Sequence, residues 1–259
     1  VSIAAPVFSP QDPTKGSVLQ RLVPPAWAEG GSARHILGTD QQGRDVLSRL
    51  IWGGRVSLTV GFTVVGIAGA FGTILGLISG YFGGWIDLLI MRVVDVQSSF
   101  PGLLVALTFV MVLGPGERNL IIALVFNGWM IHARMARSQV LSIRESTMVE
   151  SSRAIGCTSP QILFGHIFPN VVSPLITTYV LEMAHMIGAE ATMSFLGYGI
   201  QPPMSSWGLM IGEGRVYLTQ AWWLVTFPGI AVGLTILSLN LVGNWVRGEF
   251  DPLQQGKRK

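Results

Sequence analysis

The chain contains long apolar stretches without a charged residue, and their lengths match the thickness of a membrane. A bilayer core of about 30 Å is crossed by about 20 apolar residues in a helix. Residues 56–79 provide 24 consecutive positions without a charge, which predicts a spanning helix. Similar stretches predict four more spans, over 86–113, 119–140, 171–195 and 222–246. The expected fold is all-α and polytopic, with five complete spans and, at the N-terminus, the stump of a sixth.

Three of these spans carry features that refine the prediction. Asp95 and Pro101 interrupt the second span, and the proline predicts a bend because it removes a backbone hydrogen bond. The third span ends in basic residues, so we expect it to leave the membrane near residue 140. In the first span glycine recurs every four residues, at positions 72, 76 and 80. Such a row lets a neighbouring helix approach closely, although glycine is also simply commoner in spanning helices.

Composition supports a membrane protein and excludes other classes. Charged residues make up 12% of the chain, against about 25% in soluble domains. Cys157 is the one cysteine, so neither an internal disulfide nor a multi-cysteine metal site can form, and His35 and His166 have no other residue at ligand spacing. A net charge of +3 suits arginines beside a membrane better than nucleic-acid binding.

Basic residues in short loops indicate the orientation, because Lys and Arg accumulate on the cytoplasmic side. Nine of them fall on one side and two on the other. The nine are Arg92, Arg134, Arg137, Arg144, Arg153, Arg247, Lys257, Arg258 and Lys259, and the two are Arg118 and Arg215. We therefore expect the loop 141–170 and the basic tail 247–259 to be cytoplasmic. The transmembrane domain is expected to cover residues 56–246, and it contains that loop.

Residues 1–55 are then expected on the outer side. Their end predicts an amphipathic helix in the membrane interface, with Asp45 paired to Arg49 four residues on. The side chains expected to face lipid there are Val46, Leu47, Leu50 and Ile51.

The cytoplasmic loop predicts two short helices. Residues 146–154 have helical spacing, and Gly156 follows where a helix end uses a left-handed residue. Ser159-Pro160 then starts a second helix as cap and first-turn residue, and Phe168-Pro169 ends it. Such a loop could dock a partner or simply lie on the membrane surface.

The loop also resembles a known motif. E-S-S-R-A-I-G at 150–156, nine further residues and H-I-F-P at 166–169 resemble the E-A-A…G…I-x-L-P motif of ATP-binding-cassette (ABC) importer permeases. The departures are Ser151 and Ser152 for alanine, His166 for Ile and Phe168 for Leu. Over about residues 36–252 the chain resembles the C-type permease subunit of dipeptide, oligopeptide and nickel importers. The segments that carry this resemblance include G-T-D-Q-Q-G-R-D from Gly38 and S-F-L-G from Ser194.

That resemblance implies a type I ABC importer permease fold in a bacterial inner membrane. It also implies that the loop helix fits a groove on an ATPase and moves with it as a rigid lever. The residues implied in this coupling are Glu150, Ser151, Ser152, Arg153, Ala154, Gly156 and Pro169. The implied partners are a second homologous permease, two cytoplasmic ATPases, an extracytoplasmic solute-binding protein and membrane lipid, with no nucleic acid. ATP and Mg would be bound by those ATPases, so this chain is expected to be neither an enzyme nor a cofactor protein.

Charged residues within the fourth span suggest a path for the substrate. A carboxylate at the bilayer centre costs about 2.5–3.5 kcal/mol, so it should not face lipid. One arc of about 140° on that helix collects six positions, three of which carry ionisable side chains. They are Glu182, His185, Met186, Ala189, Glu190 and Met193. For Glu190 the favoured interpretation is structural, as a residue that fixes the helix end; Glu182 and His185 are the better candidates for the path.

Two other functions remain open from the residues alone. A proton-coupled secondary transporter could use Glu182, His185 and Asp95 as a relay, although no inverted repeat of broken helices is visible. An intramembrane hydrolase could use Ser194, although nothing resembles an oxyanion turn. The identity of the substrate is not determined by these patterns.

Overall fold

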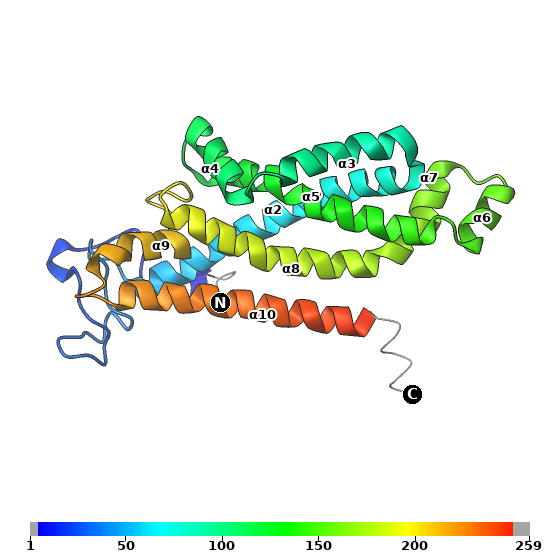
Figure 1. Cartoon of the computed structure of the whole chain (residues 1–259). Helices are drawn as coiled ribbons and strands as arrows, with labels where there is room; N and C mark the ends of the chain where they lie inside the picture. The colour runs from blue at the N-terminus through cyan, green and yellow to red at the C-terminus, as the bar shows by residue number, and fades with distance from the viewer. Residues whose placement is uncertain (1–4, 251–259) are drawn as a thin grey trace. The chain divides into compact units, whose positions relative to one another are not determined.

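All the named elements in the part that the computed structural model describes, residues 5–250, are helices or helical turns, and most of residues 9–45 form irregular chain (Figure 1). This agrees with the all-α prediction. The named elements are α1 (Ala5–Phe8), the 3₁₀ turn η2 (Val18–Gln20), α2 (Val46–Phe82), α3 (Gly84–Ser98), α4 (Gly102–Leu113), α5 (Glu117–Ile143), α6 (Thr147–Ala154), α7 (Ser159–Ile162), the π-turn η3 (Leu163–Ile167), α8 (Phe168–Phe195), α9 (Trp207–Gly214), the 3₁₀ turn η4 (Arg215–Tyr217) and α10 (Trp223–Phe250).

Three helices in the described part are long and apolar enough to cross a membrane: Val46–Phe82, Ser159–Phe195 and Trp223–Glu249. A fourth span is possible if α3 and α4, bent by 84° around Pro101, count as one. The bend expected at Pro101 is therefore present. The third predicted span is a 27-residue helix, α5, which is not in this apolar set. By length and composition alone, the count of five is not reached.

The chain forms two compact units, each described here by itself. The first comprises the residues up to Thr63, 107–123 and 185–237. Its apolar core joins the start of α2 to α9 and to the start of α10. The buried residues of this core are Val46, Met210, Ala221, Trp223 and Leu224. The predicted interfacial helix is therefore wrong: α2 begins at Val46 and continues without a break, and Val46 and Ile51 are buried in protein rather than turned to lipid.

Buried charges in this unit also pair differently from the prediction. Asp40 accepts hydrogen bonds from Arg44 Nε and Arg49 Nη1, both at 2.6 Å, and Glu213 of α9 binds the same two guanidinium groups at 3.2 and 2.9 Å. Asp45 instead caps α2, accepting from the backbone N–H of Ser48 at 2.8 Å. An i,i+4 pair needs both residues inside one helix, and Asp45 lies just before it.

The second unit comprises residues 64–106, 124–184 and the chain from Ser238. Here the glycine row of α2 packs directly on α5. A β-carbon at Gly72 would meet the carbonyl oxygen of Trp129, and one at Gly76 would meet that of Ala133. The close-packing interpretation of the row is therefore confirmed, and hydrogen is the largest substituent these positions accept.

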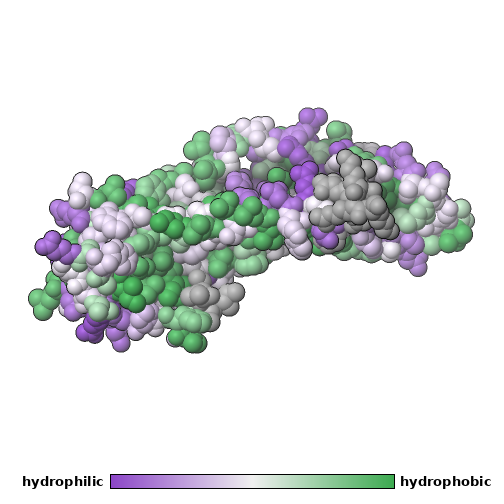
Figure 2. All heavy atoms as spheres, turned by 90° about the horizontal axis from the view of Figure 1, so that it is seen from below, coloured by the Kyte–Doolittle hydropathy of each residue, from purple (hydrophilic) through white to green (hydrophobic). Residues whose placement is uncertain are grey.

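Large apolar side chains remain exposed on several helices. Along α10 they include Ile230, Leu234, Leu237, Leu241, Val242 and Trp245. Figure 2 shows apolar residues, in green, over much of the face that it draws. An exposed apolar surface of this extent is what helices in contact with lipid or with another membrane subunit require.

Candidate coupling loop and membrane-embedded polar groups

The loop after α5 is anchored on the helix ends of the second unit. Val149, the one fully buried apolar residue of α6, packs in a core that includes Leu77 of α2 and Val140 of α5. Ile162 and Ile167, from α7 and the π-turn, complete this core from the other side of the loop. Figure 1 shows α6 and α7 beside the ends of α5 and α8. Because Val149, Ile162 and Ile167 are buried against three long helices, this loop is not a flexible linker.

Helix α6 ends as the sequence predicts, at a glycine in the left-handed region. Gly156 has φ +85°. Its N–H donates to the carbonyl of Arg153, and the N–H of Cys157 donates to that of Ser152, both at 3.0 Å. These two bonds form a Schellman motif, which satisfies the last carbonyls of the helix. The turn between α6 and α7 is therefore fixed by backbone geometry.

The second loop helix differs from the prediction at both ends. Its N-cap is Thr158 rather than Ser159, and Gln161 completes a capping box with it. The helix does not stop at Phe168-Pro169 but continues through the π-turn η3 into α8. Proline lacks an N–H, and its ring clashes with the carbonyl four residues earlier in an α-helix. The wider π-turn, closed by a bond from Phe168 N–H to the carbonyl of Leu163, directly precedes Pro169.

Most of the predicted coupling residues lie on the outside of the loop. The exposed ones are Glu150, Ser151, Arg153, Ala154, Gly156 and Pro169. Ser152 is only 6% exposed, and its hydroxyl donates to the carbonyl of Met148, so it faces inward. Ile155, which the prediction omitted, is 80% exposed at the tip of the loop.

Arginines tie this loop and its base to the end of α2. The guanidinium of Arg153 lies 5.5 Å from the centroid of the Tyr81 ring, and Arg144 Nη1 donates to the carbonyl of Gly80 at 3.1 Å. Below them Arg137 binds both carboxylate oxygens of Asp87, at 2.5 and 2.6 Å. Ser79 donates to the same carboxylate. The pair joins α5 to α3 across 50 positions in sequence, a contact that no local pattern could have predicted.

The six positions of the predicted arc on α8 divide into two groups. Met186, Glu190 and Met193 are buried, whereas His185 is exposed and Glu182 and Ala189 are partly exposed. The arc as a whole is therefore not one open surface in this chain. A helix arc predicts which residues share a face but not which part of that face another helix covers.

Glu190 is held between elements of the first unit. It accepts hydrogen bonds from Ser57 of α2 and from Ser194 of α8, both at 2.7 Å. Ser194 in turn accepts from the backbone N–H of Ile200, so its hydroxyl is fully used in structure. These contacts are those of a residue that fixes a helix end.

Asp95 pairs with Arg134 of α5 at 2.9 Å, although Arg92 is the nearest arginine along its own helix. Arg92 and Asp95 are three residues apart on one helix, but Arg134 reaches the carboxylate from a neighbouring helix. Within residues 5–250, no group of three or more His, Cys, Asp or Glu side chains is arranged to hold a metal ion.

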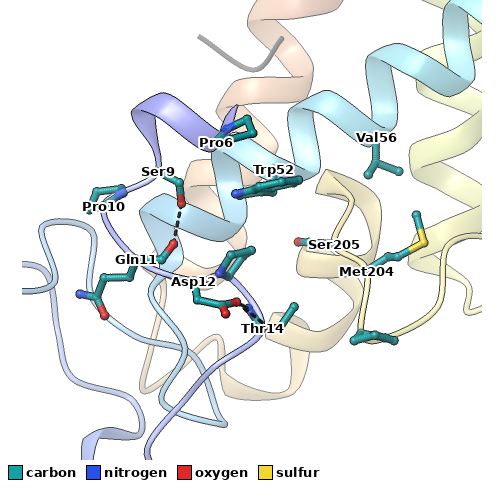
Figure 3. Close-up of a pocket in the computed structure, with 12 residues that line it drawn as sticks. Pro6, Ser9, Pro10, Gln11, Asp12, Thr14, Trp52, Val56, Met204 and Ser205 are labelled. Atoms are coloured by element: carbon teal, nitrogen blue, oxygen red, sulfur yellow. Dashed lines mark hydrogen bonds between the residues drawn. The ribbon is translucent and has the colours of Figure 1, made fainter. Parts of the chain in front are cut away.

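A cavity of about 680 Å³ opens in the first unit (Figure 3). The N-terminal segment from Pro6 to Thr14 forms one wall, and Trp52 with residues 203–205 forms another. The hydroxyl of Thr14 and, with a smaller effect, its backbone N–H donate hydrogen bonds to the carboxylate of Asp12. These bonds hold the pKa of Asp12 below its ordinary value. Asp12 is thus a fixed negative charge beside a mainly apolar cavity.

Long apolar helices and an anchored loop whose outer side is exposed define a membrane protein with a rigid surface loop. Residues 72–255 match the family model described as the binding-protein-dependent transport system inner membrane component. The chain belongs to this family.

The relatives and a solved structure agree with that membership. The chain is 39% identical to the dipeptide transport system permease protein DppC of Haemophilus influenzae, over 97% of this chain and 85% of that protein. It is 40% identical to the glutathione transport system permease protein GsiD of Pectobacterium atrosepticum, over 86% and 74%. An inward-facing MetNI methionine ABC transporter chain has the same fold, with a TM-score of 0.65 at 17% identity, over 77% of this chain and 94% of that one.

The chain is therefore a permease subunit of an ABC importer and a multi-pass protein of the inner membrane. The resemblance and the type I permease fold expected from the sequence are confirmed. It is the membrane component and not an enzyme, since ATP hydrolysis in such importers belongs to separate subunits. The secondary-transporter and hydrolase alternatives are set aside.

Proposed function

We propose that this permease imports short peptides, together with a second, homologous permease that supplies the other half of the path. Several relatives that match nearly the whole chain are named for dipeptides, di- and tripeptides or D,D-dipeptides. An extracytoplasmic solute-binding protein would deliver the substrate. Two cytoplasmic ATPases, which bind ATP and Mg, would drive transport.

The observation that supports the coupling role is the contrast between the two sides of α6. Its inner side is buried through Val149 and Ser152, and its outer side presents Glu150, Arg153 and the tip residue Ile155. A partner bound to the outer side would move the loop as a unit, because the loop core packs on α2, α5 and α8. This proposal places the loop in the cytoplasm.

The same orientation assigns the C-terminus to the cytoplasm. Arg247 lies in the last turn of α10, and the predicted basic tail beyond residue 250 lies outside the described residues. On the path itself, we assign lining roles to Glu182, His185 and Ala189, which are at least partly exposed. We assign Glu190, with its two serine partners, to the structure of the helix end.

Transport by the intact importer tests this function. The complex is purified through a tag on this chain, with its associated subunits, and reconstituted into liposomes with the solute-binding protein. We expect uptake of labelled di- and tripeptides that requires ATP. Uptake driven by a proton gradient without ATP, or ATP-dependent uptake that excludes peptides, would contradict the proposal in its mechanism or in its substrate, respectively.

A further inference from the structure

The cavity in the first unit has the size of a small-molecule site. Its volume is about 680 Å³. Pockets that hold small ligands measure about 300–1,000 Å³ and are lined mainly by apolar side chains with a few polar groups. All of the lining comes from this one unit: residues 6–14, the first turns of α2, and residues 203–205. The site is therefore complete within a single compact unit.

Prolines make the wall of this cavity rigid and poor in hydrogen-bond donors. A proline ring fixes φ and leaves the backbone without an N–H. The prolines of the lining are Pro6, Pro10, Pro13 and Pro203. Trp52 and Met204 add large apolar surfaces, and Figure 3 shows them with Asp12 around one space. Such a wall suits the apolar body of a ligand.

Several of the remaining donors are already used inside the protein. The hydroxyl of Ser9 donates to the carbonyl of Gln11 at 2.6 Å. The backbone N–H of Gln11 donates to Ser48 Oγ at 3.1 Å. On the other wall, the hydroxyl of Ser205 donates to the carbonyl of Arg49 at 3.3 Å. A ligand that brings its own donors therefore matches this wall better than one that needs donors from it.

Asp12 gives the lining an acceptor with a negative charge. Its Oδ1 accepts both bonds from Thr14, at 2.9 Å from the N–H and 2.6 Å from the hydroxyl. Its Oδ2 lies 3.5 Å from Lys15 Nζ, and that lysine side chain is 85% exposed. An ion pair so open to water is weak, and each carboxylate oxygen has two lone pairs. Oδ2 can therefore accept a further bond from a ligand.

We propose that this cavity binds the ammonium end of a short peptide whose first side chain is apolar. An ammonium has three donors and no acceptor, and Asp12 Oδ2 would accept one of its hydrogen bonds. The apolar side chain would lie against Trp52 and Met204. A lysine of a partner protein has similar chemistry, but one side chain would leave most of a cavity of this volume empty. The inference rests on the proposed function, which makes short peptides the available ligand.

Thiol protection in the purified importer, without the solute-binding protein, tests this site. In a Cys157→Ser background, Met204→Cys places a thiol in the cavity, and Val56→Cys gives a second reporter on α2. Ala33→Cys is the control, because this position is exposed and is not part of the lining. We expect leucyl-alanine to slow maleimide labelling of the two cavity thiols about fivefold or more once the site is mostly occupied. N-acetyl-leucyl-alanine, which has no ammonium group, should protect them much less, and neither peptide should protect Ala33→Cys.

The role of the carboxylate is tested in the same assay. Asp12→Asn should raise the concentration of leucyl-alanine that gives half protection about threefold to tenfold, because it removes a charge-assisted bond at a partly exposed site. Glu29→Gln is the matched control: it removes an exposed carboxylate of the same segment that does not line the cavity, and should leave this concentration unchanged.

Several results would overturn the inference. They are equal protection by the two peptides, protection that Asp12→Asn leaves unchanged, no protection at millimolar peptide, and failure of both cavity thiols to label without peptide. If Asp12→Asn instead weakened only the binding of the solute-binding protein, the cavity would hold a partner's side chain and the inference would be wrong. In each case, ATP-dependent peptide uptake by the unmodified importer would leave the proposed function standing, whereas the absence of such uptake would contradict that function itself.

Discussion

Single residues fix the geometry of the coupling loop, and Gly156 shows this most clearly. Its positive φ costs an L-residue about 1–2 kcal/mol. A β-carbon at this position would meet nothing within 4 Å, so a substitution acts through the backbone alone. The sequence located this glycine correctly because a left-handed helix end is a local property. It failed two residues further on, where Thr158 rather than Ser159 became the cap, because either of two adjacent hydroxyl residues can fill that role.

Gly156→Val should weaken the link between ATP hydrolysis and uptake. The altered turn would shift the outer side of α6 while its anchor, Val149, stays buried. We expect the importer to assemble in normal amounts, with uptake per ATP hydrolysed lowered severalfold. Uptake and ATPase activity in proteoliposomes measure this ratio.

Two variants control for the cause. Gly165→Ala, in the same loop, also places a β-carbon in open space but has no positive φ, and should behave as wild type. Gly156→Asn should restore coupling in part, because asparagine tolerates the left-handed region. A normal ratio in Gly156→Val would show that the shape of this turn does not matter for coupling.

At the scale of helices, the contact of Asp87 with Arg137 joins three elements near the loop. One carboxylate binds Arg137 of α5 and Ser79 of α2 while it belongs to the first turn of α3. The pair is partly buried, with 19% of Asp87 and 33% of Arg137 exposed. Charge-assisted bonds in such a site contribute about 1.5–3 kcal/mol, more than an exposed pair does. Motion of α5 is therefore expected to reach α2 and α3 through this contact.

Removing either charge should reduce uptake, and exchanging the two should restore part of it. Asp87→Asn and Arg137→Gln are expected to lose uptake severalfold, whereas the double variant Asp87→Arg with Arg137→Asp recovers at least some. Glu145→Gln is the matched control, because Glu145 pairs with Arg144 while 78% exposed, and should change little. Uptake normalised to the amount of protein in the membrane gives the measurement. Additive losses without recovery would show that the two residues do not act as a pair.

At the scale of the whole molecule, the proposed orientation sets which parts of the chain face the cell interior. The loop with Cys157 should lie in the cytoplasm, and the segment before α2 should lie outside. Because Cys157 is the only cysteine, and is partly exposed, the protein carries its own probe for the first part of this prediction.

Labelling of intact and permeabilised cells should separate the two sides. An impermeant maleimide should modify Cys157 only after permeabilisation. In the Cys157→Ser background, Ala33→Cys, at an exposed position before α2, should be modified in intact cells. The opposite pattern would reverse the orientation and remove the basis for placing the ATPases at α6.

What the sequence alone determined were the properties that depend on neighbouring positions: the apolar stretches, the bend at Pro101, the glycine row and the motif that marks the family. Tertiary structure decided which groups meet across long separations. It buried Val46 and Ile51 in protein, paired Asp95 with Arg134, joined Asp87 to Arg137 and hid half of the arc on α8. The reason is that periodicity fixes the direction of a side chain on its own helix, whereas burial and pairing depend on which other helix lies opposite, and lipid and protein select the same apolar residues.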